Sequence, residues 1–134
     1  MISLRHFILF FTLIVTSFIY TQEVQMNFGS VNDNSAEITM TTPVDVGGFQ
    51  FNVDGATVND ASGGDAASAG FLISTSATTV LGFSLTGGTI PSGCGILTSL
   101  ELDANPTGLS SIIVSDPEGL PLTFSYYDNG NTDG

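Results

Sequence analysis

Apolar and polar side chains alternate along most of the chain from Val24 onward. The clearest examples are residues 36–40, with the sequence AEITM, and residues 49–53, with the sequence FQFNV. A period of two places one set of side chains in a core and the other in water, as in a half-buried β-strand. The pattern predicts strands at residues 24–28, 35–42, 47–54, 56–61, 70–75, 79–86, 95–103, 109–115 and 121–127.

Short clusters of Gly, Asn, Asp and Pro separate these segments, for example at residues 32–34, 62–65, 105–108 and 116–119. Many short strands between such turns are typical of a β-sandwich or barrel. No window of a dozen residues has the pattern of an amphipathic helix. Residues 60–70 are the one place where a helical turn fits, and their glycines and small side chains favour a loop there.

We therefore predict an all-β fold, a two-sheet antiparallel sandwich of about nine strands. Burying one large apolar side chain contributes about 1.5–3 kcal/mol, so a core of a dozen such residues needs no metal or disulfide. The predicted core consists of Ile38, Met40, Phe49, Phe51, Phe71, Ile73, Leu81, Phe83, Leu85, Ile96, Leu100, Leu102 and Phe124.

The first 21 residues have a different character. Arg5 and His6 precede an almost unbroken apolar run from Phe7 to Tyr20, which is the pattern of a secretory signal peptide. The run is shorter than the roughly 20 apolar residues that span a bilayer. We expect a signal peptide at 1–21, a sandwich domain at 22–127, and a polar tail or the start of a linker at 128–134. The protein is then secreted or on the cell surface, without membrane insertion after cleavage; an uncleaved N-terminal anchor is the alternative.

The charge of the chain excludes some classes of function, and its single cysteine allows two interpretations. The chain has 13 acidic residues, and its only basic residues, Arg5 and His6, lie in the predicted signal peptide. Such a surface repels nucleic acid, which excludes nucleic-acid binding, and attracts divalent cations or a basic partner. Without an imidazole or amine, Ser-His-Asp and Cys-His catalysis is impossible, so we predict no enzyme. We expect Cys94 to be a small buried hydrophobe; pairing with another chain is the alternative.

Two groups of polar side chains are candidate calcium ligands. Residues 129–134, NGNTDG, match the first half of a calcium-binding loop, with Asn129, Asn131 and Asp133 as the candidate ligands. A polar tail without a metal is the alternative. The second group is Asp54, Asp60 and Asp65, in and before the acidic loop at 60–65. No cofactor is required for the predicted fold, and calcium remains the only candidate.

Four segments resemble, in order, parts of cohesin domains. They are residues 46–53 (VGGFQFNV), 80–87 (VLGFSLTG), 90–102 (IPSGCGILTSLEL) and 112–122 (IIVSDPEGLPL). The resemblance implies a nine-stranded jelly-roll, related to some carbohydrate-binding modules, that binds a protein partner through one sheet face. No dockerin-recognition residue transfers position by position.

Three functions follow from these observations. The first is a non-catalytic extracellular binding or adhesion module that engages a protein partner through a sheet face, which requires a contiguous apolar or hydroxyl-rich patch on that face. The second is a structural subunit that assembles with copies of itself through edge strands. The third is a carbohydrate-binding module with a polysaccharide as partner. A carbohydrate-binding module usually presents flat aromatic side chains to the sugar. This chain has no Trp, and of its tyrosines only Tyr126 and Tyr127 lie outside the predicted signal peptide, which disfavours this function.

Overall fold

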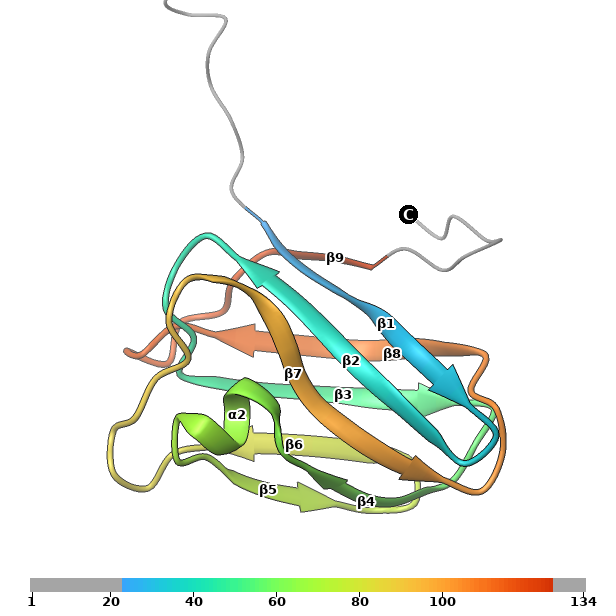
Figure 1. Cartoon of the computed structure of the whole chain (residues 1–134). Coiled ribbons are helices and arrows are strands. Elements are labelled where there is room, and N and C mark those ends of the chain that lie inside the picture. The colour runs from blue at the N-terminus through green and yellow to red at the C-terminus, as the bar shows by residue number, and fades with distance from the viewer. Residues whose placement is uncertain (1–22, 127–134) are drawn as a thin grey trace, which may run out of the picture.

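The computed structural model describes residues 23–126, which form nine strands and one short helix (Figure 1). Every predicted strand overlaps an observed one. The elements are β1 (Val24–Asn32), β2 (Ser35–Thr42), β3 (Gly48–Asp54), β4 (Val58–Ser62), α2 (Gly64–Ser68), β5 (Leu72–Thr75), β6 (Thr79–Phe83), β7 (Gly93–Leu102), β8 (Gly108–Ser115) and β9 (Phe124–Tyr126).

The strands form two sheets packed face to face, which confirms the predicted all-β sandwich. One sheet has five strands in the order β4-β7-β2-β1-β9, and the other has four in the order β5-β6-β3-β8. All neighbouring strands are antiparallel except β1 and β9, which are parallel. In Figure 1 the sheet that contains β1, β2 and β7 lies in front of the one that contains β3, β6 and β8.

The core lies between the two sheets and is built from the inward side chains of both. Phe51 and Ile38 are fully buried on β3 and β2 respectively. The rings of Phe49 and Phe51 stack with centroids 6.1 Å apart, and the ring of Phe71 lies 6.1 Å from that of Phe49 on a nearly parallel plane. Offset stacking of this kind adds to the area that the rings bury. The predicted core positions Met40, Leu100 and Leu102 are buried as expected.

The predicted core is wrong along β6, where the inward set is the opposite one. Val80 and Gly82 are buried, whereas Leu81 is 37% exposed and Phe83 is only partly buried. The reason is the ring of Phe49, the register partner of Gly82. A Cβ on Gly82 would lie 2.3 Å from that ring, so the missing side chain makes room for it. Leu81 and Phe83 therefore face away from the core.

Four other predicted core residues are exposed or half-buried for local reasons. Ile96 is 39% exposed because an irregularity between β2 and β7 leaves the consecutive residues Leu97 and Thr98 both buried, which reverses the alternation. Leu85, 77% exposed, lies beyond the end of β6, where the Ser84 hydroxyl accepts the Gly88 amide N–H in a turn. Two lie in edge strands, namely the 42% exposed Phe124 in β9 and the half-buried Ile73 in β5.

Two further predictions about residues 60–94 are wrong. Residues 64–68 form a short helix rather than a loop, because Ala66 is buried in the core and Gly64 lies where a Cβ would meet the Leu97 carbonyl oxygen at 2.5 Å. Cys94 is exposed rather than buried. It pairs in register with Thr41, which also faces solvent.

Several predictions concern residues outside 23–126. They are the signal peptide at 1–21, the tail at 128–134, Tyr127, and the calcium-loop candidates Asn129, Asn131 and Asp133. These stay predictions. Within residues 23–126 no helix is long and apolar enough to cross a membrane.

Candidate functional site

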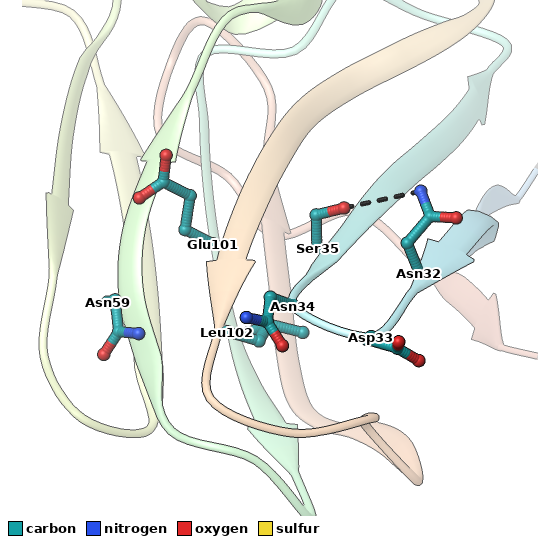
Figure 2. Close-up of a pocket in the computed structure, with 7 residues that line it drawn as sticks. All are labelled: Asn32, Asp33, Asn34, Ser35, Asn59, Glu101 and Leu102. Atoms are coloured by element: carbon teal, nitrogen blue, oxygen red, sulfur yellow. Dashed lines mark hydrogen bonds between the residues drawn. The ribbon is translucent and has the colours of Figure 1, made fainter.

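A depression of about 570 Å³ lies at the end of the sandwich that is formed by the β1–β2 turn, β4 and the end of β7 (Figure 2). The Asn32 side-chain amide donates to the Ser35 hydroxyl at 3.5 Å, and the carboxylates of Asp33 and Glu101 point away from one another in Figure 2. None of the residues that line it is aromatic, and it therefore offers no platform for a sugar ring. They are Asn32, Asp33, Asn34, Ser35, Asn59, Glu101 and Leu102.

The carboxylates Asp54, Asp60 and Asp65 do not form the predicted calcium site. Asp54 ends β3 in the four-stranded sheet and accepts the Ser110 hydroxyl at 2.9 Å, whereas Asp60 lies on β4 in the five-stranded sheet. Asp65 lies in α2, close to Gly95 of β7. Among residues 23–126 no group of three or more His, Cys, Asp and Glu side chains is placed to hold a metal ion.

Other carboxylates hold loops together. Asp45 accepts the backbone N–H of Ser92 at 3.1 Å. Asp103 accepts that of Thr57 at 2.7 Å. Charge-assisted bonds of this kind are stronger than neutral ones and fix the geometry of the segments they join. Asp45 and Asp103 therefore have structural hydrogen-bond partners, and no Lys, Arg or His lies among residues 23–126 to pair with them.

The outer face of the four-stranded sheet has a different chemistry from the rest of the surface. Leu72 and Ile113 are 51% and 53% exposed, and Leu81 and Phe83 lie between them on β6. The strand register connects these residues, because Leu72 pairs with Phe83, while Leu81 pairs with Gln50 and Gln50 in turn pairs with Ile113. We call the set Leu72, Leu81, Phe83 and Ile113 the apolar face.

A bulge in β8 turns Ile113 outward. The register between β3 and β8 shifts between Gln50 and Asn52, and Ser111 has a φ of 50°. Leu109 is buried before the bulge and Ile112 after it, so the alternation changes phase at Ser111. Bulges are a common means of re-aiming a side chain. Without this one, Ile113 would have the same parity as Leu109 and point into the core.

A notch lies in the apolar face over Gly48. Gly48 pairs with Phe83 on one side and with Ser115 on the other. Because Gly48 has no side chain, the surface falls between these neighbours into a depression of about 240 Å³. Its lining contains no ionisable group and consists of Gly47, Gly48, Phe49, Gln50, Leu81, Gly82, Phe83, Ile113 and Ser115.

The outer face of the five-stranded sheet is hydrophilic by comparison. Thr39 and Thr41 of β2 face outward, and Asp60 of β4 pairs in register with Glu101 of β7. Ile96 of β7 is an exposed apolar residue on this face, beside its register partner Thr39, whereas Phe124 of β9 pairs with the buried Val24 and lies on the inner side of the sheet. The apolar face is thus specific to one sheet.

Sequence analysis missed the residues of the apolar face because Leu81 and Phe83 match the pattern of core residues. Two local signals point to their true orientation. Gly82 shares the inward set with Val80, and the run Ile112, Ile113 and Val114 contains more consecutive apolar residues than one side of a strand can bury. The predicted patch is apolar or hydroxyl-rich; the face carries a cluster of apolar side chains in which Gln50 lies between Leu81 and Ile113.

No protein-family model and no curated protein matches the sequence. Solved structures are similar in fold. A non-cellulosomal cohesin from the hyperthermophilic archaeon Archaeoglobus fulgidus superposes with a TM-score of 0.59 at 16% identity, covering 78% of this chain and 86% of that one.

Two complexes of cohesin with dockerin are similar as well. A type I cohesin–dockerin complex from Clostridium thermocellum has a TM-score of 0.54 at 12% identity, over 82% of this chain and 91% of the other. A second cohesin–dockerin complex, crystallised at pH 5.5, gives a TM-score of 0.54 at 18% identity over 78% and 95%. At these identities the likeness concerns the fold. Residues 23–126 form a cohesin-like domain, a two-sheet sandwich with the fold of the cohesins.

Proposed function

We propose that this domain is a non-catalytic extracellular module that docks a protein partner through the apolar face of its four-stranded sheet. The observation that carries the proposal is the clustering of Leu72, Leu81, Phe83 and Ile113 on one exposed sheet surface. Contiguous apolar patches of this kind on a soluble domain mark interaction sites.

Three further observations support the proposal. The similar structures include cohesins in complex with dockerins, which are protein partners. Beyond His6 the sequence contains no Lys, Arg or His, so it cannot supply the base of a hydrolytic triad. The apolar run that ends near residue 20 is a predicted export signal, and export would place the domain outside the cell.

The test compares three charge insertions, two on the four-stranded sheet and one on the five-stranded sheet. Ile113→Asp and Leu81→Asp place a carboxylate in the middle of the apolar face, whereas Thr41→Asp places one on the outer face of the five-stranded sheet. The immobilised variants are incubated with extracellular proteins of the source organism, and retained proteins are quantified by mass spectrometry. Circular dichroism checks that each variant keeps its β-rich fold.

We expect Ile113→Asp and Leu81→Asp to reduce retention of the specific partner at least about tenfold, because an unpaired charge in a desolvated interface is costly. Thr41→Asp should change it less than about twofold. Equal retention by all folded variants would refute docking through this face. If the only retained protein were a second copy of the chain, the self-assembling subunit would replace the proposal.

A further inference from the structure

We propose that the notch over Gly48 receives one bulky apolar side chain of the partner, and that basic side chains flank that residue on the partner. This inference rests on the proposed function and specifies what the apolar face recognises. It concerns a single pocket in that face, and it can fail while docking through the face stands.

The backbone builds the notch. Gly48 faces outward at the start of β3, and the next outward position on the same strand is Gln50. A Cβ on Gly48 would lie 3.1 Å from the Ser115 hydroxyl oxygen, already inside the depression. Glycine at position 48 therefore keeps the notch open to the level of the backbone.

The walls of the notch are apolar. Phe83 and Leu81 of β6 line one side and Ile113 of β8 lines the other, while Gln50 and Ser115 add two polar, uncharged side chains. A depression of about 240 Å³ has room for a leucine or phenylalanine side chain, and an alanine methyl group would leave most of it empty. Because no ionisable group lines it, an apolar occupant leaves no buried charge unpaired.

Acidic residues lie next in sequence to two segments that line the notch. Asp45 precedes the lining residue Gly47 by two positions, and Asp116 directly follows the lining residue Ser115. Asp116 accepts the N–H groups of Glu118 and Leu120, which holds the exposed Glu118 in the same turn. Carboxylates thus lie within a few residues of the lining segments at this end of the sheet, while the lining itself contains no ionisable group.

This charge distribution selects among partners. Residues 23–126 contain acidic side chains and not one Lys, Arg or His, so a second copy of this chain would bring like charge to the rim. A partner with basic side chains beside its apolar residue is attracted before contact and keeps its cations in the wet rim of the interface. The occupant is therefore a basic protein surface with an apolar knob.

The experiment uses three blocked tripeptides as probes and the ¹⁵N-labelled domain observed by NMR. Lys-Phe-Lys carries the knob and the flanking cations, Lys-Ala-Lys lacks the knob, and Glu-Phe-Glu reverses the flanking charge. We expect Lys-Phe-Lys to bind with a Kd of about 1 mM and to shift the amide resonances of Gly48, Gln50 and Leu81. Both control peptides should bind about tenfold more weakly.

Matched variants test the two parts of the proposal separately. Gly48→Leu fills the notch and should abolish the difference in affinity between Lys-Phe-Lys and Lys-Ala-Lys. Ile113→Ser removes an apolar wall without adding bulk and should reduce the same difference, so it serves as the test if Gly48→Leu does not fold. Glu118→Gln should weaken Lys-Phe-Lys about twofold. Asp33→Asn, in the exposed β1–β2 turn at the other end of the sandwich, should leave it unchanged.

Three results would overturn the proposal: no binding of Lys-Phe-Lys at about 20 mM, equal binding of Lys-Phe-Lys and Lys-Ala-Lys, or resonance shifts centred on β2 and β7. Each of them leaves docking through the apolar face testable by the Ile113→Asp capture experiment. If that variant loses its partner while the tripeptides do not bind, the notch is not the receptor and the proposed function stands.

Discussion

The two outer faces of this sandwich are built from the same alternating pattern and have opposite chemistry. On the four-stranded sheet, Leu81 and Ile113 lie exposed beside Gly48 in a notch whose lining contains no acid, and the carboxylate of Asp54 lies at the end of β3. On the five-stranded sheet, the corresponding surface presents Thr41 and the Asp60–Glu101 pair. Fold stability requires only the inner faces to be apolar. The proposed docking function accounts for the difference between the outer faces.

The apolar outer face is a consequence of two local devices that reverse an ordinary alternation. Gly82 gives its inward space to the ring of Phe49, which turns Leu81 outward. The bulge at Ser111 turns Ile113 outward. A serine at positive φ is strained, so stability does not favour Ser111 at the bulge. Gly82 differs, because the Phe49 ring fills the space that its missing side chain leaves.

The largest expected effect is a difference in stability between substitutions on the inner and outer sides of the four-stranded sheet. Phe51→Ala should lower the free energy of unfolding by about 3–5 kcal/mol, because Phe51 is fully buried in the core. Leu81→Ala on the opposite side of the same sheet should change it by less than about 0.5 kcal/mol. Urea denaturation of both variants measures the difference. A similar loss in the two variants would mean that the apolar face serves stability.

The second effect tests why Leu81 points outward. Gly82→Ala should destabilise the domain by about 1–3 kcal/mol, because the new methyl group would overlap the Phe49 ring. Ser74→Ala, at an exposed position that pairs in register with Leu81, is the control and should change stability by less than about 0.5 kcal/mol. Thermal unfolding of both variants gives the answer. A neutral Gly82→Ala would contradict the account of the reversed strand.

The third effect concerns the bulge. Ser111→Val should destabilise by about 1–2 kcal/mol, because a β-branched residue does not tolerate a φ of 50°. Ser111→Gly should be at least as stable as the native protein, since glycine adopts this conformation without strain. The NMR resonances of Ile113 report whether the bulge persists. Equal stability of the two variants would show that Ser111 does not depend on a left-handed backbone.

The smallest effect belongs to the acidic sheet. Asp60 and Glu101 are register neighbours on β4 and β7, so Glu101→Gln should stabilise the domain by about 0.2–1 kcal/mol at low salt. The gain should disappear in about 1 M NaCl, where screening acts within roughly 3 Å. Glu23→Gln, an exposed residue before β1, is the matched control. A gain that persists at high salt would have a cause other than charge repulsion.

Much of the fold follows from the sequence because alternation and turn residues are local signals. Each of the nine strands and the two-sheet architecture is predictable in this way, and so is the burial of Phe51 and Ile38. Alternation defines two sets of side chains but not which of them faces the core. In β6 both sets contain apolar residues, and the choice depends on Phe49 from a distant strand.

The candidate site is harder to predict for the same reason. The apolar face consists of residues that a local pattern assigns to the core, and the bulge that exposes Ile113 depends on pairing between β3 and β8. The exposure of Cys94 depends on its register with β2, and the helix α2 in place of the predicted loop packs against β7. Long-range contacts, rather than composition, determine which surface is available to a partner.

Site-specific photo-cross-linking tests the central claim most directly. A photoreactive phenylalanine analogue replaces Leu81 on the apolar face in one protein and Thr41 on the outer face of the five-stranded sheet in another, and both are irradiated in the extracellular medium of the source organism. We predict one discrete protein adduct from position 81 and none from position 41. An adduct from position 41 alone, or the same adducts from both positions, would contradict docking through the apolar face.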